Sequence, residues 1–448
     1  ATLYKEHFND NEKALLDYNK AIELEPENSD NYYYRGRFYK DYLEDYDKAI
    51  VDFSKGIELN SSDPRLYFNR AHSYASLDND IKSIADYLTC EELDPEYDVT
   101  LYNNLAVQYK NLQDYDKALE VYGRAIKMDS NYVLAYKNRA LLHTNNLNDP
   151  EAALLNYDKM IELQPDTAYN YYYRGNFYRD YLKDYEKSIE DYTTAIELNP
   201  DDVEFYYKRS DSYELNNELN ESMLDHLKTI EMDSSYHAYA NYKIGNIYSK
   251  LKNELINAEK YLLKSIELDY WDLAASHYSL GYVYLNNNEY DKALKEFNKA
   301  LALKPENTNY ILGKVNYFVL TNEFNLAIKL CKKLLEINNK DPHTYYILAD
   351  IYNNKSFVNN SQTKSLINIS LAIDKLTYLG EYNYFITDYY NLERIELVDL
   401  YKFRAKIFEN LNENSFSCSD YNKVLELIDN DSADANSVVL LISKNCSD

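Results

Sequence analysis

The chain has 448 residues, of which 45% are hydrophobic and 27% are charged, and it contains only eight glycines and eight prolines. This composition fits a soluble, helix-rich chain and argues against a disordered, fibrous or strand-rich one. The formal net charge of −27 repels phosphate backbones, so we expect no nucleic-acid partner.

A small residue recurs every 34 to 36 residues between residues 36 and 349. The segment Tyr32–Tyr39 (YYYRGRFY), for example, returns as Tyr171–Tyr178 (YYYRGNFY). The aligned small positions are Gly36, Ala71, Ala106, Ala140, Gly175, Ser210, Gly245, Gly281, Val315 and Ala349, with Ala405 following at a longer distance. An aromatic residue, or His143 in one repeat, lies three residues after each, which is one turn of a helix.

A second small residue follows in each repeat after a break rich in Asn and Asp, for example at Ala118 and Ala293. Many repeats then close with a proline such as Pro165, which cannot continue a helix but suits the start of the next one. Small residues allow two antiparallel helices to approach closely. The pattern therefore predicts a helical hairpin as the repeated unit.

One repeat carries the pattern of a known family almost in full. Its matching residues are Leu280, Gly281, Tyr284, Tyr290, Ala293, Phe297, Ala300 and Pro305. This pattern resembles the tetratricopeptide repeat. The resemblance covers nearly the whole chain and implies an all-α, right-handed superhelical solenoid of about eleven hairpins. In this family the first helix of each hairpin lines a concave side, where extended peptides bind.

In chain order, the repeats divide the sequence into five expected segments. They are an incomplete N-terminal repeat with mainly its second helix (1–29), nine consecutive repeats (30–342), a repeat with an insertion (343–385), a final repeat with an extended first helix (386–430), and a capping helix with the C-terminal tail (431–448).

The insertion is expected because the spacing between Ala349 and Ala405 rises to 56 residues. We expect the stretch Asn353–Ser361 to lengthen one turn and Tyr382–Glu393 to extend the first helix of the final repeat. At the other end, the short first segment indicates either a fragment of a longer array or an end that docks onto another surface.

The chain has no recognisable catalytic or cofactor signature. Motifs for phosphate-binding loops, dinucleotide sites, serine hydrolases and zinc proteases are missing from the sequence. The seven histidines have no metal-ligand spacing, and His143 is expected in the core because it replaces an aromatic residue. We therefore expect no catalytic residues, no metal, no cofactor and no enzymatic activity.

The four cysteines, Cys90, Cys331, Cys418 and Cys446, lie far apart and form no CxxC motif. This spacing suggests neither a disulfide framework nor a zinc site, so we expect a cytoplasmic or other reducing intracellular compartment. The apolar run Val438–Ile442 is too short to cross a bilayer, and we expect no membrane insertion.

The positions that the resemblance places on the concave side carry more cations than anions. Between residues 30 and 286 they hold nine Lys or Arg and six Asp or Glu, so this face is near +3 in an acidic chain. The candidate ligand-binding residues of this kind are Lys137, Arg179, Lys208 and Lys243, with Asn246 beside the last. A cationic groove favours a partner segment with acidic side chains or a terminal carboxylate.

Amides and aromatic rings complete the candidate binding face. Asn69, Asn104 and Asn138 hold one position in three successive repeats, similar to a short asparagine ladder in O-linked N-acetylglucosamine transferases. Such amides can hold an extended backbone, although chance placement in an Asn-rich chain is the alternative. An aromatic ring stands three residues before the small residue in six repeats, and Tyr172, Tyr207 and Tyr242 are the candidate binding residues among them. These rings serve either as contact anchors or as packing between first helices.

Two functions follow from these observations. The first is a non-enzymatic protein–protein interaction scaffold that binds an extended or acidic peptide segment in its concave groove. The alternative is a structural subunit of a large or filamentous assembly, held by end-to-end contacts and by the insertion at residues 353–393.

Overall fold

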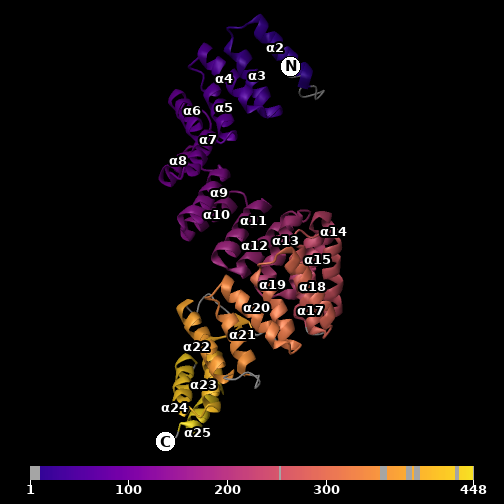
Figure 1. Cartoon of the computed structure of the whole chain (residues 1–448). Helices are drawn as coiled ribbons and strands as arrows, with labels where there is room; N and C mark the ends of the chain where they lie inside the picture. The colour runs from indigo at the N-terminus through magenta and orange to yellow at the C-terminus, as the bar shows by residue number, and fades with distance from the viewer. Residues whose placement is uncertain are drawn as a thin grey trace. The chain divides into compact units, whose positions relative to one another are not determined.

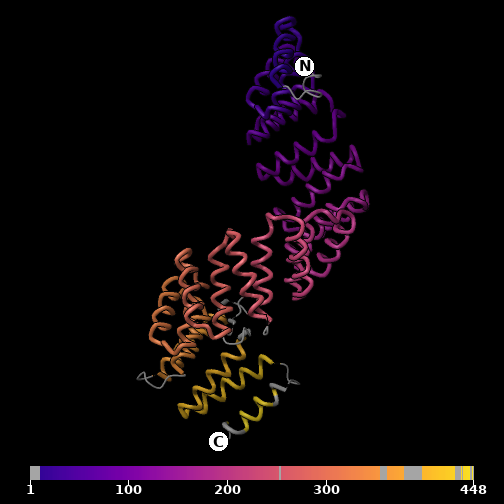
Figure 2. The backbone as a smooth tube through the Cα atoms, turned by 90° about the vertical axis from the view of Figure 1, so that its right-hand side faces the viewer, coloured from indigo at the N-terminus to yellow at the C-terminus, as the bar shows by residue number. Residues whose placement is uncertain are grey.

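The computed structural model describes residues 11–251, 254–353, 361–379, 386–387, 394–428 and 433–446, and these residues fold into two compact units, Ala1–Lys228 and Thr229–Asp448. Helices dominate both units, and within each unit most helices pack against the next one in the chain (Figure 1). Within each unit the backbone runs back and forth through successive helices (Figure 2). The prediction of an all-α fold built from helical hairpins is confirmed.

The described part of the first unit begins with a single helix and continues with hairpins. Its helices are α2 (Asn11–Leu24), α3 (Ser29–Tyr42), α4 (Tyr46–Leu59), α5 (Pro64–Ser76), α6 (Asp80–Leu93), α7 (Val99–Asn111), α8 (Tyr115–Met128), α9 (Val133–Leu142), α10 (Pro150–Leu163), α11 (Ala168–Asn176), α12 (Tyr185–Leu198), α13 (Val203–Leu215) and α14 (Leu219–Met232), which crosses the unit boundary. Two π-helical turns, η1 (His143–Leu147) and η2 (Phe177–Leu182), prolong α9 and α11.

The second unit continues the same architecture. It comprises the short 3-10 helix η3 (Ser234–Tyr236), α15 (His237–Lys250), α16 (Leu255–Glu267), α17 (Leu273–Asn286), α18 (Tyr290–Leu303), α19 (Thr308–Leu320), α20 (Phe324–Ile337), α21 (Pro342–Asn353), α22 (Ser361–Leu379), α23 (Leu397–Asn410), α24 (Asn414–Leu427) and α25 (Ala433–Asn445). Between α22 and α23, the two-residue strands β1 (Ile386–Thr387) and β2 (Arg394–Ile395) pair antiparallel.

The turn inside each hairpin explains the breaks rich in Asn and Asp. In the α9–α10 turn, Asn148 adopts a left-handed conformation with φ of 53°, which Asn tolerates better than most residues. The next residue, Asp149, then accepts a hydrogen bond of 3.1 Å from the backbone N–H of Ala152 and caps α10. The same left-handed position is held by Glu44, Asp78, Gln113, Lys183, Asn217, Asn288, Asn322 and Asn412.

The small residues lie where the two helices of a hairpin meet. Ala106, Ala118 and Ala140 are fully buried, and a Cβ added to Gly281 would lie only 2.7 Å from Phe297 Cε1. Most of the largest fully buried rings belong to one column, four residues after the second small residue, of which the sequence analysis named only Phe297. Its members include Phe53, Tyr87, Tyr122, Tyr157, Tyr192 and Phe297.

The final hairpin corrects one expectation. Its first helix, α23, begins at Leu397 and has 14 residues, so the predicted helical extension over Tyr382–Glu393 is wrong where it can be checked, at the strand residues Ile386–Thr387. The helix α22 has 19 residues and accounts for part of the longer spacing. The expected turn insertion, from Asn353 to Ser361, lies almost entirely outside the described residues.

The cysteines correct a second expectation, because Cys418 and Cys446 form a disulfide with their Cα atoms 5.8 Å apart. Cys418 lies in the second turn of α24, and Cys446 directly follows α25. Packing of α25 against α24 brings them together over a separation of 28 residues. Cys90 and Cys331 are free and buried. The disulfide removes the argument from cysteine spacing for a reducing compartment.

Candidate functional site

The predicted concave-face residues are divided between the two units. Eight of them belong to the first unit, while Tyr242, Lys243 and Asn246 belong to α15 of the second. The first-unit set is Asn69, Asn104, Lys137, Asn138, Tyr172, Arg179, Tyr207 and Lys208. The site is therefore built from contacts inside the first unit.

Two of the three ladder asparagines are connected through a residue that the sequence analysis missed. The amide of Asn138 on α9 donates a hydrogen bond of 2.9 Å to Asn103 Oδ1 on α7, and Asn103 donates one of 3.2 Å to Asn104. Asn69 lies apart: it is only 5% exposed and donates to the carbonyl of Arg65 in its own helix. The chain Asn138, Asn103 and Asn104 thus places a continuous row of amides across α7 and α9.

The predicted cations differ in how far they are neutralised. Arg179 is only 8% exposed and forms two hydrogen bonds to Asp180, of 2.7 and 2.8 Å. Burial opposes its charge, but Asp180 outweighs burial and raises the pKa of Arg179. Lys208 lies 3.3 Å from Glu204. Both cations are therefore balanced by carboxylates beside them.

Lys137 has a different environment. Its Nζ lies 5.0 Å from the ring centroid of Tyr173, and no carboxylate of the described residues forms an ion pair with it. Lys110 on α7, another cation of the predicted concave face, likewise has no such partner among the described residues. Since α7 packs against α9, the uncompensated positive charge of this face lies on these two helices.

The tyrosines pack between neighbouring helices. Tyr172 on α11 lies 5.5 Å from the Phe205 ring of α13, and its hydroxyl donates a 3.2 Å hydrogen bond to Glu204. In the second unit, Tyr242 stacks on Tyr270 at 4.8 Å. The Tyr207 ring lies 4.8 Å from Lys208 Nζ. Packing between neighbouring helices is therefore sufficient to explain the positions of Tyr172 and Tyr242.

The sequence analysis missed a repeated ion pair inside the hairpins. Five arginines, each directly before the first small residue, donate through Nε and Nη2 to both oxygens of an aspartate on the second helix, at 2.7 to 2.9 Å. The pairs are Arg35–Asp52, Arg70–Asp86, Arg174–Asp191, Arg209–Asp225 and Arg404–Asp420. A recurrent Arg with Asp 16 or 17 residues later was the signal that could have revealed them.

One group of side chains has the arrangement of metal ligands. Ligand atoms of Asp211, Glu214 and His226 lie within 4.8 Å of one another, and His226 is buried in the column that holds aromatic rings in most repeats. Each of the three also makes another contact within the chain. Clusters of this kind are common without an ion, and proximity is the sole indication, so we assign no metal here.

Hairpins of antiparallel helices, stacked through small and aromatic residues, define the chain as a helical repeat protein. Five segments match family models described as tetratricopeptide repeat or TPR repeat, at residues 17–51, 64–97, 99–132, 181–217 and 274–307. The chain is a tetratricopeptide-repeat protein, as its sequence predicted. Proteins of this family generally mediate protein–protein interactions.

Several solved structures are similar to the chain. A TPR protein fragment from Cytophaga hutchinsonii is 20% identical and covers 63% of this chain and 98% of its own, with a TM-score of 0.44. A tetratricopeptide repeat protein from Parabacteroides merdae is 17% identical, covering 57% and 98%, with a TM-score of 0.41. YrrB, described as a TPR protein with an unusual peptide-binding site, is 22% identical, covering 43% and 97%, with a TM-score of 0.37. No curated protein matches the chain.

Among the described residues, no helix combines the length and the apolar character needed to cross a membrane.

Proposed function

We propose that the protein is a non-enzymatic interaction scaffold that binds an acidic, extended segment of a partner protein on the first-helix face of α7 and α9. The observation that carries this proposal is the pair Lys110 and Lys137, which no described carboxylate neutralises in a chain of net charge −27. An acidic segment would complement this charge. The amides of Asn104 and Asn138 lie on the same two helices and can bind its backbone.

The proposal is narrower than the groove expected from the sequence. Asn69 and Arg179 are buried, and Lys208 is balanced by Glu204, so we assign them a supporting role at most. Tyr242, Lys243 and Asn246 remain candidates on the second unit. The alternative of an assembly subunit relied on the N-terminal end and the 353–393 insertion, and no contact of the described residues favours it.

The experiment compares the binding of a fluorescein-labelled library of acidic peptides to the wild-type chain and to the double variant Lys110→Ala, Lys137→Ala. We expect binding to weaken about tenfold, since two partly exposed charge contacts of roughly 0.7 kcal/mol each are lost. Fluorescence polarisation gives the dissociation constants.

The matched control is Lys127→Ala, which removes the same charge from an exposed position on α8. Its affinity should stay within twofold of the wild type. Equal affinity of the double variant and the wild type would show that this face does not bind the peptides.

A further inference from the structure

Arg139 on α9 occupies the same position as the five arginines that pair with aspartate, but its hairpin lacks the aspartate. Asn156 of α10 stands in that place and accepts one hydrogen bond of 2.8 Å from Arg139 Nε. The Asn156 amide donates in turn to the backbone carbonyl of Ala152. The carboxylate that neutralises each of the other five arginines is thus replaced by a neutral amide.

A second acceptor is also missing. In the five paired cases, Nη1 of the arginine donates at 2.7 to 3.3 Å to a side chain on the second helix of the preceding hairpin. These acceptors are Asn19, Ser54, Asp158, Thr193 and Ser370. The equivalent residue for Arg139 is Gly123 on α8, where an added Cβ would meet no atom within 4 Å.

The result is a guanidinium that, among the described residues, has a single hydrogen-bond acceptor and lies 5.7 Å from the ring centroid of Tyr136. No described residue accepts a hydrogen bond from Nη1 or Nη2 of Arg139. Burial lowers the pKa of Arg139, whereas in Arg70 and Arg174 the same effect of burial is outweighed by the aspartate, which raises the pKa. An anion beside Arg139 would restore the balance that the other hairpins have.

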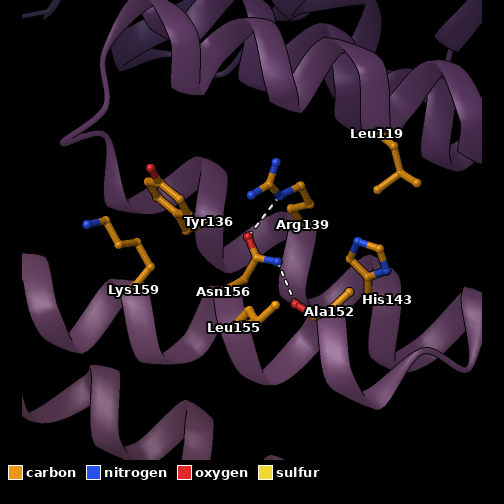
Figure 3. A pocket seen from close by; sticks show the side chains of 8 residues that line it. All are labelled: Leu119, Tyr136, Arg139, His143, Ala152, Leu155, Asn156 and Lys159. Atoms are coloured by element: carbon orange, nitrogen blue, oxygen red, sulfur yellow. Dashed lines mark hydrogen bonds between the residues drawn. The ribbon is translucent and has the colours of Figure 1, made fainter.

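Arg139 points into a cavity of about 510 Å³ between α8, α9 and α10 (Figure 3). We call it the Arg139 cavity. It is lined by Leu119, Tyr136, Arg139, His143, Ala152, Leu155, Asn156 and Lys159. None of these residues is acidic, although the chain as a whole has 75 Asp and Glu. Lys159 adds a second cation, and its Nζ also binds Glu162.

Apolar side chains line part of the same cavity. Leu155 is 71% exposed, and Leu119 faces the cavity from α8 (Figure 3). A free Nη1 and Nη2 pair matches the two oxygens of a carboxylate, and the leucines can pack against an apolar neighbour of that carboxylate. A phosphate would draw on more cations than this site provides.

We propose that the Arg139 cavity binds a carboxylate side chain of a partner polypeptide in which acidic and apolar residues are adjacent. This site is distinct from the first-helix face, because Lys137 and Arg139 lie two positions apart on α9 and project about 200° from each other. A partner can therefore be held on two sides of α9.

The test uses the full chain and two fluorescein-labelled peptides, one of repeated Gly-Glu-Leu and one of repeated Gly-Gln-Leu. The variant Asn156→Asp installs the carboxylate found in the other five hairpins, so it should fold normally and neutralise Arg139 internally. Asn131→Asp, at an exposed position, is the control with the same charge change. Acetate and inorganic phosphate serve as competitors that represent free anions.

We expect the Glu peptide to bind the wild type at least tenfold more tightly than the Gln peptide. Asn156→Asp should weaken that binding at least tenfold, whereas Asn131→Asp and the double variant Lys110→Ala, Lys137→Ala should change it less than threefold. The proposal is overturned if the Asn156→Asp variant binds the Glu peptide as tightly as the wild type does. It is also overturned if the two peptides bind the wild type equally, if neither binds, or if free phosphate alone binds.

Discussion

At the scale of single residues, the same amino acid has opposite roles at different positions. Gly281 allows the close approach of α17 and α18, since an added Cβ would lie 2.7 Å from the ring of Phe297. Packing does not require a glycine at position 123, because a Cβ there would meet nothing within 4 Å. A helix-interior glycine without a packing reason costs stability relative to alanine. At Gly123 the missing side chain instead leaves Nη1 of Arg139 without its usual acceptor.

We therefore predict opposite effects for two equivalent substitutions. Gly123→Ala should stabilise the protein by about 1 kcal/mol through helix propensity. Gly281→Ala should destabilise it by about 1–3 kcal/mol, because the ring of Phe297 must shift in a closely packed core. Thermal unfolding followed by circular dichroism measures both. A lower melting temperature of Gly123→Ala than of the wild type would contradict the prediction, because it would mean that other atoms occupy the space beside Gly123.

At the scale of the element, several hairpins hold their two helices together with a partly buried polar contact, and the residues that form it vary. The α17–α18 hairpin has Leu280 where others have arginine, and His277 replaces the arginine function. His277 Nδ1 lies 2.6 Å from Glu296 Oε2, and Lys299 binds the other oxygen of Glu296 at 2.8 Å. The Glu296 side chain is only 8% exposed.

This arrangement gives the α17–α18 hairpin a predicted dependence on pH. Burial favours the neutral form of Glu296, but His277 and Lys299 outweigh burial and lower its pKa below the ordinary value of 4.5. A lowered folded-state pKa stabilises the hairpin above pH 4.5, and this contribution is lost as the pH falls through the folded-state value. The variant Glu296→Gln lacks the contribution at every pH.

Melting temperatures of the wild type and Glu296→Gln should therefore differ at pH 7, by the equivalent of about 2 kcal/mol, and converge toward pH 3. Glu267→Gln is the control, because that side chain is 68% exposed in its pair with Lys264. A difference between wild type and Glu296→Gln that persists unchanged at pH 3 would contradict the assignment.

At the scale of the whole molecule, short-range packing and long-range charge act differently. Each hairpin of a solenoid packs mainly on its neighbours, so packing energy is a sum of local terms. The charge imbalance of 75 acidic against 48 basic residues acts over longer distances. Self-repulsion of a large net charge destabilises a compact state.

We predict that the melting temperature rises with ionic strength at pH 7. The Debye length falls from about 30 Å at 0.01 M salt to about 8 Å at 0.15 M, so repulsion between hairpins is screened. The five partly buried Arg–Asp pairs are screened less than exposed charges. Differential scanning calorimetry in NaCl and KCl at matched ionic strengths checks the effect. A melting temperature that falls with salt would show that attractive surface pairs dominate.

The sequence by itself determined that the chain forms helical hairpins and where most of the turns between their helices lie. Ala106, Ala118 and the other small residues recur at fixed spacing because each hairpin must meet its neighbour in the same way, and such local constraints are written directly into residue type. The Asn- and Asp-rich breaks likewise indicated the turns, because the left-handed residue and the helix cap in each turn favour these residue types. Among the candidate site residues, Asn104 and Asn138 share one position of the repeat and lie on α7 and α9, which pack against each other.

Only the tertiary structure decided which polar groups neutralise one another. A lysine or arginine in a sequence column looks the same whether or not a carboxylate reaches it, and this depends on distances of 3 to 4 Å between different helices. Arg179 proved to be buried against Asp180, while Arg139 lost both usual partners through Asn156 and Gly123. The disulfide between Cys418 and Cys446 required the packing of α25 on α24, which residue spacing does not specify.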